Sequence, residues 1–386
     1  MFTNEQQFVL DALRCAIRAE DTALTAWEGK KLDPDTVAKI IRKNGILLTV
    51  FPALKDFPII QNSLREEYYA AIAQSVRQDY EGKRILSALN SEELDCIALK
   101  GWEMRLLYPK PTMRQMADLD ILVREYNYQK IKKLMIRLGY KAEPESSWMH
   151  DSFIKDSITV EIHKRLTDDS GEIQKWEKQL WSRAIPTDES SHIFCMKHED
   201  YYIFHLLHMY KDFHYGCLGL RRVIDTWLIS HAYPYMDRAY LNEKFTILKL
   251  IPFAERMEIL GRVVAGEAAM DNNSECLLMA AFRYGIYGTA DLYKLGRIVS
   301  MSGISDNMTG GMVRSFIRAL FLPYSRMKAH FPVLEKYPVL LPCCWMVRIL
   351  KEARRHIHDG RQLLDYRGLS RADYEEMKRF FEAGGC

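Results

Sequence analysis

The chain has 386 residues, 48% of them hydrophobic and 27% charged, which is typical of a globular protein of more than one structural unit. Its formal net charge of +3 gives no support for a strongly basic nucleic-acid-binding protein. The eight cysteines form no CxxC pair, so the usual sequence signal of a zinc or redox site is missing. The N-terminus does not have the pattern of a signal peptide, and no stretch reaches the roughly 20 apolar residues of a membrane span. We therefore expect a cytoplasmic location and no membrane partner.

The first 92 residues are expected to be helical, because apolar residues recur at three- and four-residue spacing. A long helix is predicted over residues 63–89. Residues spaced by four along it predict one buried stripe, formed by Tyr68, Ile72, Val76 and Tyr80. We place an N-terminal helical region at residues 1–92.

The pattern changes at residue 95, where short apolar runs alternate with turn signals. Strands are predicted over residues 95–100, 116–123, 150–155 and 157–164, with helices over residues 101–108 and 125–138. Gly139 stands where a helix C-terminal cap belongs, and residues 155–157 are short enough for a hairpin. Residues 93–168 should thus form a small α/β unit with a mixed sheet. Residues 169–386 are expected to be helical, most clearly over 198–211 and 220–232, which makes the fold class α+β.

Asp118 and Asp120 lie in the second predicted strand. Residues two apart in a strand point to the same face, so the two carboxylates should lie side by side. Such a pair is costly to desolvate unless a cation lies between the carboxylates, and Mg²⁺ (or Mn²⁺) takes ligands of this kind. In the strand over 157–164, Glu161 alternates with apolar residues. If the two strands are neighbours, Glu161 completes a three-carboxylate site suited to two-metal phosphoryl transfer.

Each of these signals also has a simpler interpretation. Asp118 and Asp120 could be solvated residues at a strand end, and Glu161 could be an exposed residue of a half-buried strand. His163 could orient a carboxylate or an acceptor, or it could be structural. Four further histidines could bind zinc or pack in the interior; they are His198, His205, His208 and His214.

Several stretches taken together resemble the bacterial family of uncharacterised nucleotidyltransferases, over a span from about residue 20 to 350. The stretches are Leu99–Gly101, Arg114–Val123, Leu138–Tyr140, Val160–His163, His205–Lys211, Gly219–Asp225 and Tyr324–Trp345. The resemblance implies a nucleotidyltransferase palm flanked by helical regions. It also implies that Asp118, Asp120 and Glu161 bind the metal and are catalytic.

The resemblance further implies a set of residues that bind the nucleotide. Lys100 and Gly101 occupy the place of the superfamily's phosphate-binding Gly-Ser turn, although this chain has no serine there. Lys211 is implied on the phosphates, Asp225 near the base or ribose, and Arg221 on the same helix face as Asp225. We predict that Lys211 and Asp225 line the same cleft as the carboxylates. The alternatives are a solvated strand-end lysine for Lys100 and a surface ion pair for Arg221 with Asp225.

The implied activity is the transfer of a nucleoside monophosphate from a nucleoside triphosphate such as ATP to a hydroxyl acceptor on a small molecule, sugar, protein or RNA. A toxin-like or RNA-directed nucleotidyltransferase would need a basic groove, which a net charge of +3 does little to support. A non-catalytic nucleotide-binding module would be expected to have lost one of the three carboxylates. The oligomeric state stays open. Because carboxylates without a metal repel each other, Asp120→Asn is expected to leave stability unchanged or to raise it.

Overall fold

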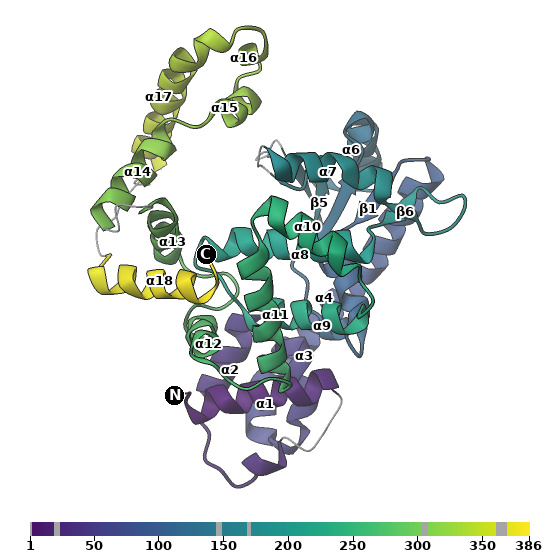
Figure 1. The fold of residues 1–386 in the computed structure, drawn as a ribbon. Coiled ribbons are helices and arrows are strands. Elements are labelled where there is room, and N and C mark those ends of the chain that lie inside the picture. The colour runs from purple at the N-terminus through teal and green to yellow at the C-terminus, as the bar shows by residue number, and fades with distance from the viewer. Residues whose placement is uncertain (1, 19–23, 144–148, 168–170, 303–307, 360–368) are drawn as a thin grey trace. The chain divides into compact units, whose positions relative to one another are not determined.

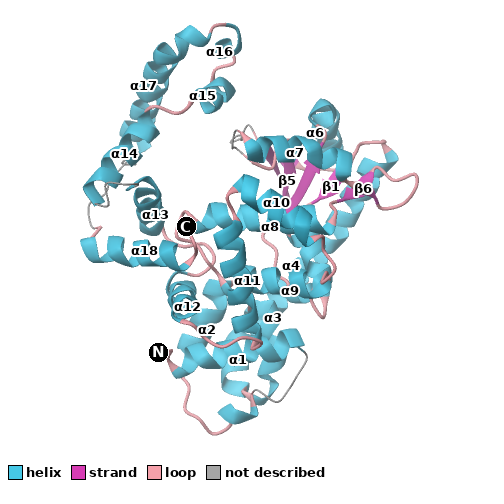
Figure 2. Ribbon diagram, in the orientation of Figure 1, coloured by secondary structure: helices cyan, strands magenta, loops and turns pink. Residues whose placement is uncertain are grey.

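The computed structural model describes residues 2–18, 24–143, 149–167, 171–302, 308–359 and 369–386 (Figure 1). The chain divides into two compact units. The first unit comprises residues 1–211, 217–287 and 383–386, and the second comprises residues 212–216 and 288–382. The sheet belongs entirely to the first unit, among helices, and the described part of the second unit is helical (Figure 2). The fold class is α+β, as predicted.

The N-terminal part of the first unit is helical, as the apolar spacing predicts. Its helices are α1 (Asn4–Arg18), α2 (Pro34–Asn44), α3 (Leu47–Val50) and α4 (Pro58–Ser91). The ends of α2 show how the sequence sets a helix boundary. Asp33 caps its start by accepting a hydrogen bond from the Thr36 amide at 3.2 Å, and Gly45 ends it at a φ of +63°.

The buried stripe predicted for α4 is wrong, since Tyr68 and Ile72 are only partly buried and the other two members are exposed. Val76 is 56% exposed and Tyr80 is 67% exposed, whereas Gln78 and Gly82 are buried. The apolar spacing gave a wrong prediction because this part of α4 packs through the polar side chain of Gln78 and through the backbone at Gly82, which has no side chain. The Gln78 side-chain amide donates to the carbonyl oxygens of Met116 and Ala117, at 3.4 and 3.3 Å. These contacts hold the segment that leads directly to Asp118.

Seven strands form one mixed sheet in the order β3-β4-β5-β2-β1-β7-β6. They are β1 (Cys96–Ala98), β2 (Leu119–Val123), β3 (Lys141–Ala142), β4 (His150–Lys155), β5 (Ile158–His163), β6 (Ile185–Pro186) and β7 (Ile193–Cys195). In the centre, β1 and β2 are antiparallel, and β2 and β5 are parallel. The predicted hairpin connects β4 to β5 through Asp156 and Ser157, both at positive φ, as a tight hairpin turn requires.

The expectation that the chain is helical from about residue 173 onward is wrong at residues 185–195. β7 lies there and runs parallel to β1, and β6 pairs with β7 at the edge of the sheet. These strands are only two and three residues long, so they carry no periodicity that a sequence pattern could reveal. β1, the strand that joins β7 to the rest of the sheet, is far away in the sequence.

One face of the sheet forms a hydrophobic core with α4 and α6 (Tyr128–Arg137). The strands contribute alternate residues to it, among them Leu119, Ile121, Val160 and Ile162. The residues between them, including Asp120, therefore lie on the opposite face. The expected alternation of apolar and polar side chains along the strands is therefore confirmed. The face opposite the core carries the candidate site.

Further helices complete both units. The first unit has α5 (Gly101–Met104), α7 (Glu172–Arg183), α8 (His198–Phe213), α9 (Leu220–Ala232), α10 (Arg238–Leu248), α11 (Ile251–Ala265) and α12 (Asn272–Tyr284), with the last two residues of α8 in the second unit. The second has α13 (Ala290–Ser302), α14 (Met308–Leu320), α15 (Tyr324–His330), α16 (Val333–Lys336), α17 (Leu341–Asp359) and most of α18 (Arg371–Ala383). Among the helices in the described ranges, none is long and apolar enough to cross a bilayer.

Candidate active site

Three carboxylates meet on the polar face of the sheet. Asp120 lies opposite Glu161 in the parallel pair of β2 and β5, and Asp118 immediately precedes β2. One oxygen from each carboxylate lies within 4.8 Å of the other two. The predicted proximity of the two acidic strands is therefore confirmed. Asp120 is buried, whereas Asp118 and Glu161 are partly exposed, so solvent reaches the cluster through these two residues.

Two nitrogen-bearing side chains contact Asp120. Lys100 Nζ lies 2.7 Å from Asp120 Oδ1, and His163 Nε2 lies 2.8 Å from the same oxygen. His163 Nε2 is also 3.1 Å from Glu161 Oε2, so this ring links two of the three carboxylates. Lys100 follows β1 and His163 ends β5, and three adjacent strands thus place the contacting groups.

The turn at Lys100 and Gly101 has an unusual backbone. Lys100 has a φ of +46°, which costs free energy in a residue with a side chain. The turn is held by the Tyr201 hydroxyl, which donates to the Lys100 carbonyl oxygen at 3.0 Å. At Gly101, a Cβ atom would lie 2.7 Å from Arg114 Nη1 and 2.8 Å from Met116 Sδ. Glycine is therefore required there for close packing of the cavity wall.

A cavity of about 200 Å³ opens beside Asp118 and Asp120. Four cationic side chains line it, namely Lys100, Arg114, Arg221 and Arg222. Aromatic side chains also line it, among them Tyr201, Phe204 and Tyr287. Cationic groups suit phosphates and aromatic rings suit a nucleobase, so the lining has the chemistry that a nucleotide needs.

Comparison with known proteins identifies the family. Residues 30–260, which are more than half of the chain, match a family model described as "Uncharacterised nucleotidyltransferase". The chain belongs to that family. No curated protein matches it. No solved structure matches it either. Family membership confirms the resemblance seen in the sequence.

Two carboxylates in the acidic cluster of this nucleotidyltransferase family member have pKa values that are shifted in opposite directions. Burial raises the pKa of Asp118 to about 6, and the nearby Asp120 charge adds to the rise. Burial disfavours the charged form of Asp120 as well, but Lys100 and His163 outweigh it and hold the pKa of Asp120 well below its usual range. Burial likewise opposes the charge of Lys100, yet Asp120 and Asp118 raise its pKa overall. Asp120 and Lys100 are therefore both charged at neutral pH.

The charged partner of Asp120 shows that the stability expected of Asp120→Asn is wrong. The sequence argument assumed two carboxylates with no cation between them, whereas Asp120 has the Lys100 ammonium at 2.7 Å. Removing the charge of Asp120 leaves a largely buried lysine without its counter-ion, so the substitution should destabilise the fold. The original reasoning applies instead to Asp118, which makes no ion pair within the described ranges and lies next to a like charge.

Asp225 and Arg221 both line the cavity, but not as partners of each other. Asp225 is 1% exposed, and it accepts hydrogen bonds from Arg114 Nη2 and from the Tyr108 hydroxyl, each at 2.8 Å. Arg221 donates from Nη1 to the Gln115 carbonyl oxygen at 2.9 Å. The alternative of a surface ion pair between Arg221 and Asp225 is therefore wrong, because both side chains are buried and each has another partner.

Lys211 does not lie where we predicted. It is exposed near the end of α8 and is not among the residues that line the cavity. The lining residues of α8 are Tyr201, Phe204, His205, His208 and Met209. Lys211 is less than a turn beyond them, past the part of the helix that faces the cavity. The structure brings Asp118, Asp120, Glu161, Lys100, Gly101, Arg221 and Asp225 into one region and leaves Lys211 outside it.

The sequence pattern did not single out several residues of the cavity wall, notably Arg114, Arg222, Tyr201 and Tyr287. His205 and His208 also line the cavity, and burial lowers the pKa of His205 to about 4 and that of His208 well below its usual range. Both rings are therefore neutral. The spacing of Tyr201, His205 and His208 on α8 does indicate a shared helix face, but not what this face contacts. In the described part of the chain, no group of metal ligands includes these two histidines.

Proposed function

We propose that the chain transfers a nucleoside monophosphate from a nucleoside triphosphate to a hydroxyl acceptor in this cavity. One observation carries the proposal: Asp118, Asp120 and Glu161 converge beside a cavity with cationic walls. Family membership gives the general reaction class. Three carboxylates so close together repel one another, which is unfavourable unless the site binds positive charge.

The three carboxylates fit a Mg²⁺ or Mn²⁺ ion. Such ions prefer hard oxygen ligands, and Asp118, Asp120 and Glu161 offer oxygens within 4.8 Å of one another. The Lys100 ammonium already lies against Asp120, which indicates that this position favours a cation. When bound, the metal would offset the triphosphate charge and increase the acidity of the attacking hydroxyl.

The cavity wall supplies the nucleotide contacts in this proposal. Lys100 contacts Asp120 and lines the cavity, so its ammonium can contact a phosphate next to the acidic cluster. Within the described ranges, the buried Nε of Arg221 has no hydrogen-bond partner, so it can donate to a phosphate or sugar oxygen. The rings of Tyr201 and Tyr287 offer flat surfaces on which a base can stack.

The proposed reaction uses the carboxylates and Lys100 in the following steps. The acceptor hydroxyl oxygen attacks the α-phosphorus, a new phosphate ester bond forms, and the bond to the bridging oxygen breaks so that pyrophosphate leaves. The hydroxyl proton passes to a carboxylate oxygen of Glu161, which is partly exposed and can release the proton to solvent. Lys100 balances negative charge on the phosphates as pyrophosphate separates.

A labelling screen tests the proposal. The full chain is incubated with each of the four triphosphates labelled at the α-phosphate, with Mg²⁺ or Mn²⁺, and with small-molecule, protein and RNA fractions of a cell extract. We expect label in one fraction, with the product identified by mass spectrometry. Label in RNA alone would support the RNA-directed alternative, and the absence of label from every fraction would contradict nucleotidyl transfer.

The chain offers a matched control for the acidic cluster. Asp95 accepts from Arg124 Nε at 3.0 Å and contacts His192 Nδ1 at 2.8 Å, so, like Asp120, it has one histidine and one cationic partner. Asp95→Asn should retain transfer, whereas Asp120→Asn should lose it. Equal loss in both variants would indicate a general effect of removing a charge from the sheet.

A further inference from the structure

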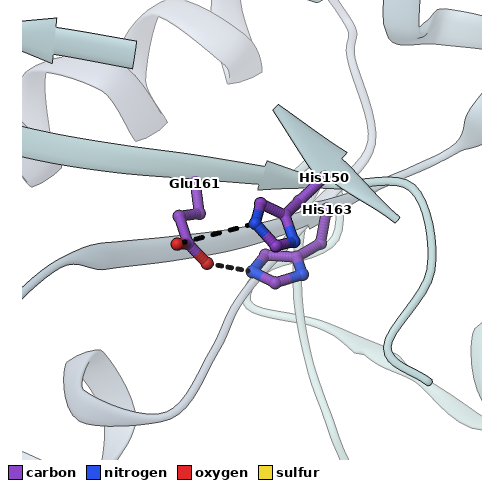
Figure 3. Close-up of side chains that lie close together, drawn as sticks. All are labelled: His150, Glu161 and His163. Atoms are coloured by element: carbon purple, nitrogen blue, oxygen red, sulfur yellow. Dashed lines mark ion pairs between the residues drawn. The ribbon is translucent and has the colours of Figure 1, made fainter. Parts of the chain in front are cut away.

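A second group of metal-ligating side chains lies on the β4–β5 hairpin (Figure 3). His150 and His163 are opposite each other in the antiparallel ladder, and Glu161 precedes His163 by two residues on the same face. His150 Nε2 lies 3.7 Å from Glu161 Oε1, and His163 Nε2 lies 3.1 Å from Glu161 Oε2. The hairpin register thus directs two imidazoles toward the two oxygens of one carboxylate.

The environment of His150 is not explained by its protein contacts. Its Nδ1 atom is buried without a hydrogen-bond partner in the described part of the chain. Its Nε2 atom is too far from Glu161 for a hydrogen bond at 3.7 Å, and its ring centre lies 4.8 Å from that of His163. The nitrogen that faces Glu161 is Nε2, and since it makes no hydrogen bond to that carboxylate, it is available to a ligand bound between the ring and Glu161.

We propose that His150, Glu161 and His163 bind a first-row transition-metal cation of the zinc and cobalt class. Zinc–nitrogen and zinc–oxygen bonds of about 2.1 Å in a tetrahedral shell place neighbouring donor atoms about 3.4 Å apart. His163 Nε2 lies 3.1 Å from one oxygen of Glu161, and His150 Nε2 lies 3.7 Å from the other; each distance is close to this value. The side chains of His150 and Glu161 are 25% and 21% exposed, so an ion has a route in and water can complete its shell.

This site differs in chemistry from the all-oxygen site of the proposed function. Imidazole nitrogen favours zinc, cobalt and nickel over magnesium, which prefers oxygen. Asp118 belongs only to the carboxylate cluster, His150 only to the nitrogen-rich group, and Glu161 to both. Because His163 Nε2 also contacts Asp120 Oδ1 at 2.8 Å, a cation bound to this nitrogen would replace that hydrogen bond and place positive charge next to Asp120. The assignment goes beyond nucleotidyl transfer and can be tested without nucleotide.

Cobalt titration tests the site. The full chain is freed of metal with a chelator and titrated with Co²⁺, and visible absorption reports the ligand field of the bound ion. We expect one equivalent to produce the strong bands of a four- or five-coordinate ion, Zn²⁺ to abolish them, and excess Mg²⁺ to leave them unchanged. His150→Ala and His163→Ala should each weaken Co²⁺ binding by at least about tenfold.

Two further variants separate this proposal from the proposed function. His192→Ala removes a histidine that pairs with Asp95 elsewhere on the sheet and should bind Co²⁺ like the wild type. Asp118→Asn should keep the Co²⁺ spectrum but lose Mg²⁺-dependent nucleotide binding, and His150→Ala should show the reverse. Circular dichroism checks that each variant is folded. Co²⁺ binding by folded His150→Ala with wild-type affinity and spectrum would overturn the proposal, as would wild-type protein that produces no such bands.

Discussion

The guanidinium of Arg114 forms a two-point hydrogen bond with the carboxylate of Asp225. Arg114 Nε lies 3.1 Å from Oδ1 and Nη2 lies 2.8 Å from Oδ2. The two residues are 111 positions apart, and their side chains are 11% and 1% exposed. The pair ties the segment before β2 to α9, and both residues line the cavity. It therefore fixes the cavity wall opposite the sheet.

Breaking this pair should destabilise the fold strongly. Asp225→Asn leaves the buried Arg114 cation without its counter-ion, so the free energy of unfolding should fall by about 3–5 kcal/mol. Urea unfolding followed by tryptophan fluorescence measures the change. The matched control is Glu258→Gln, which removes a more exposed ion pair with Arg238 and should cost less than about 1 kcal/mol. Equal effects of the two substitutions would mean that the Arg114–Asp225 pair does not support the wall.

The stability of the chain should fall as the pH is lowered from about 6.5 to 4. Burial lowers the pKa of His205 to about 4, whereas in the unfolded chain this group takes up a proton near pH 6.5. Between these values the unfolded state binds more protons, so acidification favours unfolding. The slope from His205 is at most about 1.4 kcal/mol per pH unit.

Urea unfolding at pH 7, 6 and 5 checks this prediction, with His205→Gln as the comparison. Glutamine does not titrate and can retain a hydrogen bond to Thr226, whose Oγ1 atom lies 2.9 Å from His205 Nε2. The variant should lose less stability on acidification than the wild type. The same pH slope in both proteins would show that His205 is not a neutral buried group.

Gly82→Ala should be destabilising although it lies within a helix. Alanine normally stabilises a helix by about 1 kcal/mol relative to glycine. Here the new methyl carbon would lie 2.1 Å from Trp102 Cζ3, so the ring must move. We expect a net loss of about 1–3 kcal/mol in thermal or urea unfolding. Ser87→Ala, at an exposed position of α4, should be neutral, and Gly82→Ala with a raised unfolding midpoint would contradict the packing described here.

Much of the acidic cluster could be predicted because its residues lie in or next to regular strands. The period of two places Asp118 with Asp120 and Glu161 with His163, and an acidic residue on each of two neighbouring strands suffices to bring the carboxylates together. The short hairpin likewise predicts that His150 and His163 lie on paired strands. It does not predict their register, because this depends on the turn that the chain adopts.

The cavity wall could not be predicted in the same way. Arg114 lies in an irregular segment, and its partner Asp225 is on a helix in a distant part of the sequence. How far along α8 the contact with the cavity extends is set by tertiary packing, which is why His208 lines the cavity and Lys211, three residues later on the helix, does not. β7 was missed for a related reason, since three residues acquire their strand conformation only by pairing with β1.

The most direct test of the central claim is α-phosphate transfer by Asp118→Asn. Asp118 borders the cavity, and burial together with the Asp120 charge raises its pKa to about 6, so the substitution removes an unfavourable charge. Stability should be unchanged or slightly higher, while transfer of the labelled nucleotide should fall by about 10²-fold or more. Binding of the triphosphate with Mg²⁺, followed by calorimetry, should weaken in parallel. Wild-type transfer by a folded Asp118→Asn variant would contradict the assignment of this cluster as the nucleotidyl transfer site.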